Sequence, residues 1–237
     1  MKILAFDSTA KTASVAVSDG KKTLASYNVD NGLTQSELLL PMAEAMLKNL
    51  GLTFSDIDAY AVNVGPGSFT GVRIGVSLVK GLAFGKNTPC IPVSTLESLA
   101  ENLRGIEGIL VPVMDARRAQ VYTAIFRSNK ERIERLTEDE ALPFSTLYER
   151  LNEFKGEKIY LVGDGYSVAS KALAESGLMQ LMKTPEILIA QNAASTAKVA
   201  YEKYKNGEYT DDKTLSPVYL RMPQAERERL DKEKNAK

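Results

Sequence analysis

The segment Gly65 to Gly75, GPGSFTGVRIG, constrains the fold of this chain more than any other. It joins an apolar strand, expected at 59–64, to a helix expected at 70–84. In the turn between them glycines bend the backbone, a proline stiffens it and a hydroxyl caps the helix. The residues assigned to this structural turn are Gly65, Pro66, Gly67, Ser68, Thr70 and Gly71. The start of such a helix can attract an anion, yet the segment lacks the lysine and the following serine or threonine of a phosphate-binding P-loop.

The helix after this turn carries small residues on one face. At 100° per residue, Gly71, Gly75 and Leu78 fall on the same side. Because a glycine inside a helix costs up to about 1 kcal/mol, this stripe indicates that another backbone comes close to it. That backbone belongs either to another protein or to the sheet of this chain, and the pattern leaves both open.

A helix expected at 34–50 presents an unusually wide apolar arc. Its apolar side chains cover roughly 220° around the helix axis, whereas a one-sided surface helix needs little more than about 100°. Met42 and Met46 suit an adaptable contact surface. We therefore expect this helix to bury two sides, one inward and one against a partner. The alternative is a helix enclosed within its own fold.

Composition excludes several classes of function. Thirty basic residues balance thirty acidic ones, so no net charge draws the chain to nucleic acid or to an anionic membrane. With no histidine and Cys90 as the one cysteine, a typical zinc site and histidine-dependent nucleophilic catalysis cannot be built. No metal site is expected, although carboxylates could still hold Mg²⁺. The start of the chain reads as a strand rather than a signal peptide, and no apolar run suits a membrane helix, so the chain is expected to be cytoplasmic.

A strand that ends in an aspartate and leads into a hairpin occurs twice. Asp7 follows an apolar strand at 2–6, and Asp115 follows one at 109–114. The segments after them, 12–18 and 119–126, both alternate between apolar and polar residues. This pattern predicts a duplication, with one half at 1–107 and the other at 108–237 including a charged tail at 225–237. Further strands are expected at 23–29, 90–93 and 158–162, and further helices after Ser94 and around 144–154, 168–176 and 192–204.

The two aspartate turns are weak candidates for a nucleotide site. Asp7 could hold a hydrated Mg²⁺, and the backbone around Ser8 and Thr9 could meet a phosphate. Asp115 stands in the same position of the second half. The alternative is a polar turn that merely closes each hairpin.

The chain resembles the bacterial TsaB (YeaZ) family, the tRNA threonylcarbamoyladenosine biosynthesis proteins, nearly from end to end. The segments that carry the resemblance are GPGSFTGVRIG, ILAFDST at Ile3 to Thr9, LLPM at Leu39 to Met42, VSTLESLA at Val93 to Ala100, DARRAQVY at Asp115 to Tyr122 and PVYLR at Pro217 to Arg221. The resemblance implies an α/β fold of the actin-like (ASKHA, ribonuclease H-like) class, made of two duplicated halves.

The resemblance also implies a function. It indicates a non-catalytic scaffold, not an enzyme, that binds and activates its paralogue TsaD, the transferase that places threonylcarbamoyl on the tRNA adenosine beside the anticodon. The implied partners are TsaD in a heterodimer, the ATPase TsaE in a larger complex, a second copy when the chain is alone, and tRNA only through the complex. ATP and a metal ion are implied for the complex, but no cofactor bound tightly by this chain. The paralogue's metal site uses two histidines on a helix, which this sequence lacks, so glycoprotease activity is not expected.

Two alternatives stand beside this function. One is an actin-like ATP-dependent phosphotransferase that works alone through Asp7 or Asp115. The other is a self-sufficient homodimer unconnected with tRNA.

In the family, the first two helices of the N-terminal half form the partner surface. Carried over to this chain, the interface is expected at Leu39, Met42, Met46, Val72, Gly75, Val76 and Val79. Gln35 stands where family members often have histidine, and we therefore expect no catalytic role for it.

Overall fold

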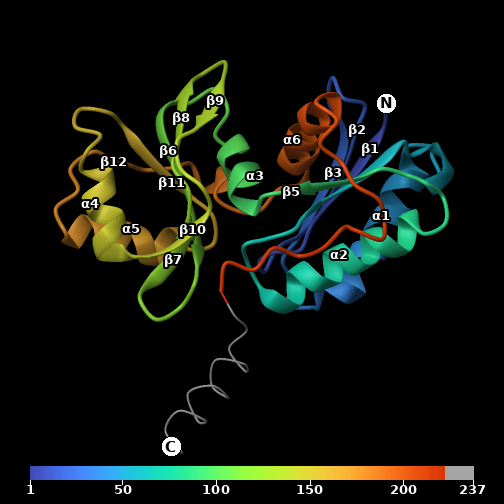
Figure 1. Ribbon diagram of the computed structural model, residues 1–237, viewed down its shortest axis with the longest axis horizontal. Helices are drawn as coiled ribbons and strands as arrows, with labels where there is room; N and C mark the ends of the chain where they lie inside the picture. The colour runs from blue at the N-terminus through green and yellow to red at the C-terminus, as the bar shows by residue number, and fades with distance from the viewer. Residues whose placement is uncertain (222–237) are drawn as a thin grey trace, which may run out of the picture.

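The computed structural model describes residues 1–221, which form two α/β halves lying side by side (Figure 1). Each half is a sheet with helices on both faces. The charged tail expected at 225–237 lies outside the described residues.

The first half is built on a five-stranded sheet in the order β3-β2-β1-β4-β5. Its strands are β1 (Ile3–Asp7), β2 (Ala13–Ser18), β3 (Thr23–Val29), β4 (Ala59–Asn63) and β5 (Cys90–Val93). β2 runs antiparallel to β1 and β3, while β4 is parallel to both β1 and β5. Every residue of β1, β2 and β4 is buried, because both faces of the sheet are covered, and this explains their nearly continuous apolar sequences.

The second sheet repeats this plan. Its strands are β6 (Glu107–Asp115), β7 (Gln120–Thr123), β8 (Phe126–Asn129), β9 (Ile133–Arg135), β10 (Glu140–Pro143), β11 (Ile159–Val162) and β12 (Leu181–Met182). The first residues of β6 pair with β8 and its last residues with β7. β11 is parallel to both β6 and β12, as β4 is to β1 and β5. Asp7 and Asp115 end the corresponding central strands, so the expected α/β fold of two duplicated halves is confirmed.

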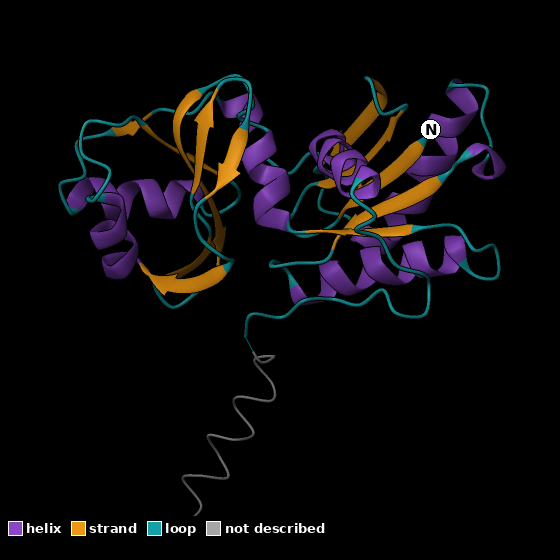
Figure 2. Ribbon diagram, turned by 45° about the horizontal axis from the view of Figure 1, so that its top comes forward, coloured by secondary structure: helices purple, strands orange, loops and turns teal. Residues whose placement is uncertain are grey.

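The helices follow the same repeat. They are α1 (Gln35–Asn49), α2 (Phe69–Ala83), α3 (Thr95–Glu101), α4 (Phe144–Leu151), α5 (Tyr166–Glu175) and α6 (Ala193–Lys205), with 3-10 turns at Phe54–Asp56 and Glu186–Leu188. Thr34 and Glu37 form a capping box at the start of α1, while Ser94 caps α3 and Asn192 caps α6. α1 and α2 cover one face of the first sheet, and α4 and α5 cover one face of the second (Figure 2).

The remaining two helices are exchanged between the halves. α6 packs the small side chains of Ala193, Ala197 and Ala200 against the free face of the first sheet. α3 packs its leucines against β6, β8 and β11 in the second. Where the two helices meet, the buried hydroxyls of Ser98 and Thr196 lie 2.9 Å apart. The expected boundary at 107/108 falls after the first residue of β6, and each side of it contributes a helix to the sheet of the other side.

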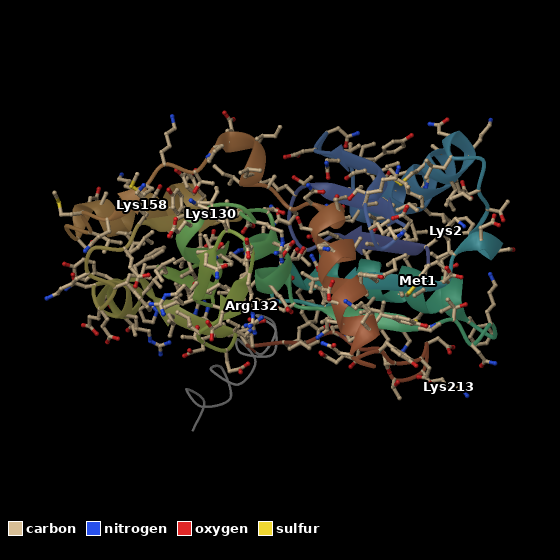
Figure 3. All side chains as sticks on the ribbon, turned by 90° about the horizontal axis from the view of Figure 1, so that it is seen from above. Met1, Lys2, Lys130, Arg132, Lys158 and Lys213 are labelled. Atoms are coloured by element: carbon tan, nitrogen blue, oxygen red, sulfur yellow. The ribbon has the colours of Figure 1, made fainter. Side chains whose placement is uncertain are left out.

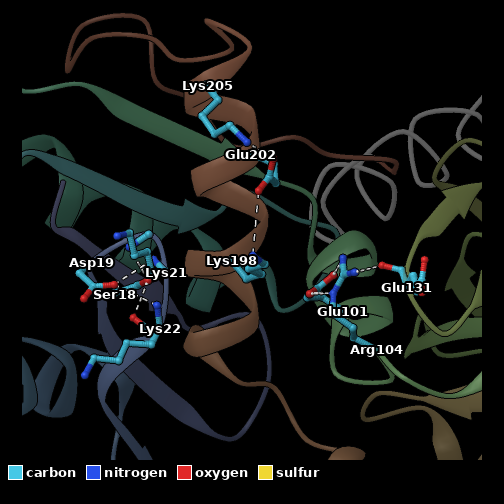
Figure 4. A network of polar contacts seen from close by, with 11 residues as sticks. Ser18, Asp19, Lys21, Lys22, Glu101, Arg104, Glu131, Lys198, Glu202 and Lys205 are labelled. Atoms are coloured by element: carbon cyan, nitrogen blue, oxygen red, sulfur yellow. Dashed lines mark hydrogen bonds and ion pairs between the residues drawn. The ribbon is translucent and has the colours of Figure 1, made fainter.

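Charged side chains surround this pair of helices. Just after α3, Arg104 pairs with Glu101 and donates to the backbone oxygen of Glu131 at 2.6 Å (Figure 4). On α6, Glu202 lies between Lys198 and Lys205, at 4.0 and 2.9 Å. Such surface pairs contribute little to stability. The labelled cations in Figure 3 are likewise spread over both halves.

Among residues 1–221, no helix is both long enough and apolar enough to cross a membrane.

Candidate functional site

The turn at Gly65 to Gly71 packs closely against the β1–β2 turn of the same chain and forms hydrogen bonds with it. The amide of Ser68 donates to the carbonyl oxygen of Thr9 at 2.7 Å, and the hydroxyl of Ser8 donates to the carbonyl oxygen of Gly71 at 2.8 Å. A Cβ on Gly67 would lie 2.5 Å from the Thr9 oxygen, and one on Gly71 would overlap the carbonyl oxygen of Ser8. Only glycine therefore allows this close approach.

The glycine stripe of α2 faces the chain's own sheet. A Cβ on Gly75 would overlap the hydroxyl of Ser8 and lie 3.2 Å from the Val62 methyl. Of the two possibilities left open by the sequence, the backbone that approaches the stripe is the β1–β2 turn.

The prediction of the partner surface has to be corrected. The residues expected there pack into the core between α1, α2 and the first sheet, because the apolar arc of α1 and the stripe of α2 face inward. Leu39, Met42, Met46, Val72, Gly75, Val76 and Val79 are all buried in this single chain. Of the seven, only Leu39, which is 1% exposed, also lines the depression between the two helices, so a partner that docks there meets mainly other side chains.

Those other side chains form the α1/α2 groove, a mostly apolar depression of about 550 Å³. Its lining residues are Gln35, Ser36, Leu39, Leu40, Phe69, Thr70, Arg73, Ile74, Ser77 and Leu78. Leu40 and Phe69 are each 37% exposed, and the guanidinium of Arg73 lies over the Phe69 ring at 5.2 Å. Large half-exposed apolar side chains on two adjacent helices are typical of a protein-binding surface.

Gln35 connects this groove to the β1–β2 turn. Its amide nitrogen donates to the carbonyl oxygens of Ala10 and Lys11 at 2.8 and 3.0 Å. Its side-chain oxygen is buried and has no partner among the described residues. The residue therefore fixes the turn beside the start of α1.

A second depression, the inter-half cleft, also measures about 550 Å³. Its walls come from the β1–β2 turn, the Gly65–Gly71 turn, the β6–β7 turn and the end of the described chain. The lining residues are Thr9, Ala10, Lys11, Pro66, Gly67, Ser68, Phe69, Thr70, Val72, Met114, Asp115, Ala116, Arg117, Tyr122, Asp164, Val218, Tyr219, Leu220 and Arg221. Of the weak nucleotide candidates, Thr9 and Asp115 line the cleft, whereas Asp7 and Ser8 do not.

Asp7 is fully buried behind the cleft. It accepts hydrogen bonds from the amide and hydroxyl of Thr9 at 2.9 and 2.7 Å, and from the side chain of Asn63 at 2.5 Å. Burial raises the pKa of Asp7, against the opposing effect of these hydrogen bonds. The geometry is that of a carboxylate that closes its own turn.

Two backbone amides beside the cleft are not free to bind a phosphate. The amide of Thr9 already donates to the Asp7 carboxylate, and that of Ser68 to the Thr9 carbonyl oxygen. Carboxylates stand on the other wall. Among residues 1–221, no cluster of three or more metal-ligating side chains is present.

Asp164 is a cleft residue that the sequence analysis did not single out. It lies in the turn after β11, and its carboxylate accepts the amide hydrogen of Asp115 at 3.2 Å. Although the residue is exposed overall, partial desolvation by the cleft walls, aided by the charges of Asp115 and Asp7, raises its pKa to about 6. The signal in the sequence was an aspartate between two glycines, Gly163 and Gly165, directly after a buried strand.

The raised pKa of Asp164 makes stability depend on pH. The folded chain binds this proton more tightly than the unfolded chain, whose value is near 3.8, so the stabilisation from protonation is lost as pH rises towards about 6. Asp164→Asn keeps a side-chain oxygen that can accept the Asp115 amide hydrogen, but it has no group that titrates in this pH range. We expect its gain in free energy of unfolding over the native chain, measured by urea denaturation, to be larger at pH 7 than at pH 5. An equal gain at both pH values would contradict the assignment.

The end of the described chain, residues 213–221, forms a strap across α2. Lys80 donates to the carbonyl oxygens of Lys213 and Leu215 at 3.2 and 3.1 Å. Further along, the amide of Val218 donates to the carbonyl oxygen of Val64 at 2.8 Å, and Arg221 donates to the carbonyl oxygen of Ala116 in the second half at 3.1 Å. The strap thus joins the two halves at the cleft.

Comparisons with known proteins match the chain to one family model and to curated relatives over most of its length. The family model described as "TsaD: tRNA N6-adenosine threonylcarbamoyltransferase" matches residues 34–229. The tRNA threonylcarbamoyladenosine biosynthesis protein TsaB of Bacillus subtilis is 31% identical, over 99% of this chain and 100% of its own length. The protein of the same name from Escherichia coli is 33% identical, over 93% of this chain and 95% of its own. The solved structure "YeaZ from Pseudomonas aeruginosa" is 26% identical, with a TM-score of 0.75, and covers 92% of this chain and 99% of its own.

Proposed function

The chain belongs to the TsaB family, and on that premise we propose that it serves tRNA threonylcarbamoyladenosine biosynthesis as a non-catalytic subunit that binds and activates a TsaD-type transferase. One observation carries the proposal: the chain matches the transferase family model over most of its length yet has no histidine in 237 residues. It thus shares the fold of the transferase without the imidazole ligands that the resemblance implies for the transferase's metal.

The state of the cysteine does not support a role as an independent hydrolase either. A second solved structure is titled as having similarity to "peptidase YEAZ". In this chain the one cysteine, Cys90, is buried, and burial raises its pKa to about 11, so the reactive thiolate is disfavoured near neutral pH.

The α1/α2 groove is the proposed docking site for the transferase. A paralogue of the same fold carries its own pair of helices at the corresponding place, so a helix pair on each protein can pack against the other. Two copies of this chain can meet in the same way, as a homodimer, when the paralogue is absent. We place the complex in the cytoplasm, with the ATPase TsaE as a further subunit that brings ATP.

The direct test is reconstitution of threonylcarbamoyl transfer to tRNA with and without this chain. Transfer by the TsaD paralogue is expected to depend on its addition, and the two proteins are expected to elute together in size-exclusion chromatography. Transfer that is equally fast without the chain would refute activation. Transfer by this chain alone, or tight Mg-ATP binding with turnover in calorimetry, would refute the non-catalytic role.

A further inference from the structure

The inter-half cleft is lined by cations and by exposed aromatic rings. Lys11 comes from the β1–β2 turn and Arg117 from the β6–β7 turn, both exposed, and the half-buried Arg221 comes from the strap. Phe69 and Tyr219 also line the cleft, 37% and 44% exposed, with their rings stacked at 4.8 Å. We name this set the cleft rim.

The charges of the rim are not neutralised at close range. Within the described residues, no carboxylate lies within ion-pair distance of Lys11, Arg117 or Arg221, whereas cations such as Arg127 and Arg150 are paired. Three cations line this opening against two carboxylates, Asp115 and Asp164, which leaves a small local excess of positive charge. Such an excess attracts phosphate groups.

The same cleft also carries two carboxylates. Asp115 and Asp164 line it, and the amide of Thr9 in the β1–β2 turn already donates to Asp7. Phosphates are therefore favoured beside the cations and disfavoured beside the two carboxylates. Because the cations come from three separate segments, they can contact successive phosphates of an extended strand.

The aromatic pair adds a surface on which a base can stack. Single-stranded nucleic acid is commonly bound by cations along its backbone and by aromatic rings against its bases. Phe69 lines both the cleft and the α1/α2 groove, so a strand at the rim would pass directly beside a partner docked in the groove.

We propose that the cleft rim contacts tRNA directly within the transferase complex, with Lys11 and Arg117 binding its phosphates and Tyr219 stacking on a base. This inference rests on the proposed function, because it places the transferase in the neighbouring groove. It adds a direct contact to the expectation that tRNA is met only through the complex. The chain's neutral net charge agrees with a supplementary contact and not with tRNA binding by this chain alone.

The test uses the reconstituted complex and fluorescently labelled tRNA, with affinity measured by anisotropy at several salt concentrations. The double variant Lys11→Glu, Arg117→Glu is expected to bind at least about ten-fold more weakly, with a salt slope reduced by about 1 to 2. Tyr219→Leu is expected to lose about five-fold or more in affinity with an unchanged slope, because stacking releases no counterions.

A matched control is Lys158→Glu. Lys158 is exposed and lies beside Gly108, at the opposite end of β6 from Asp115, so its charge is remote from the cleft. It should leave tRNA affinity unchanged. Lys11→Gln with Arg117→Gln provides a milder second variant, and circular dichroism melts verify that each protein folds.

The two proposals can fail separately. If no complex elutes with the native chain, the proposed function is wrong. If the complex forms and both rim variants keep full tRNA affinity, the direct contact is refuted. Loss of ATP binding in the rim variants with tRNA affinity unchanged would also refute it, because the rim would then serve a nucleotide.

Discussion

Gly71→Ala is expected to destabilise the chain by about 3 kcal/mol, although alanine is the better helix former. The new Cβ overlaps the carbonyl oxygen of Ser8, and a backbone oxygen in a buried turn cannot move aside as a flexible side chain can. The same Ser8 donates its hydroxyl hydrogen to the carbonyl oxygen of Gly71, so the change also disturbs this buried hydrogen bond. The melting temperature should fall by about 6 to 12 °C for a chain of this size, as measured in thermal melts.

Gly81→Ala is the matched control on the same helix. A Cβ at Gly81 meets no atom within 4 Å, so this change should stabilise the chain by about 0.5 to 1 kcal/mol through helix propensity alone. The two substitutions are therefore expected to change the free energy of unfolding in opposite directions. If Gly71→Ala proves neutral or stabilising, the carbonyl oxygen of Ser8 does not pack closely against Gly71 in the folded chain.

Leu78→Glu is expected to weaken assembly with the transferase at least about a hundred-fold, because a carboxylate buried against an apolar partner without a counter-charge costs several kcal/mol. Leu78 is half-buried at the edge of the groove, so the free chain tolerates the change better than it would tolerate a charge at Val76, which is 3% exposed. Isothermal titration calorimetry with the TsaD paralogue measures the loss directly.

Val168→Glu provides the control for assembly. Val168 is a 51% exposed apolar residue on α5 in the second half, outside the groove. This variant should bind the transferase as the native chain does. Full binding by Leu78→Glu, or equal losses in both variants, would remove the groove as the docking site.

Much of the fold could be predicted from local patterns in the sequence. The strand at Thr23–Val29 is found with the expected bounds, since alternation and turn residues fix both of its ends. The helix expected after Ser94 begins at Thr95, with Ser94 as its cap. The aspartates at the ends of two apolar strands identified the duplication, because they mark the same point in each half. Short edge strands such as β12, with two residues, carry too little pattern to detect.

The sequence did not predict which surface packs against each apolar helix face. Periodicity shows that one side of a helix is apolar, but it does not say which surface covers that side. For this reason the stripe at Gly71 and Gly75 was open to a partner or to the sheet, and the exchange of α3 and α6 between the halves was not foreseen. Asp164 escaped notice because its role depends on β11 lying beside β6, a contact between residues far apart in the chain.

The position of α3 and α6 determines how the two halves can move. The two helices meet through the buried hydroxyls of Ser98 and Thr196, whereas on the cleft side the halves are joined by the bond from Arg221 to the Ala116 oxygen. A rotation that widened the cleft about this helix pair would have to break the bond made by Arg221. The strap therefore opposes separation of the two halves on the cleft side.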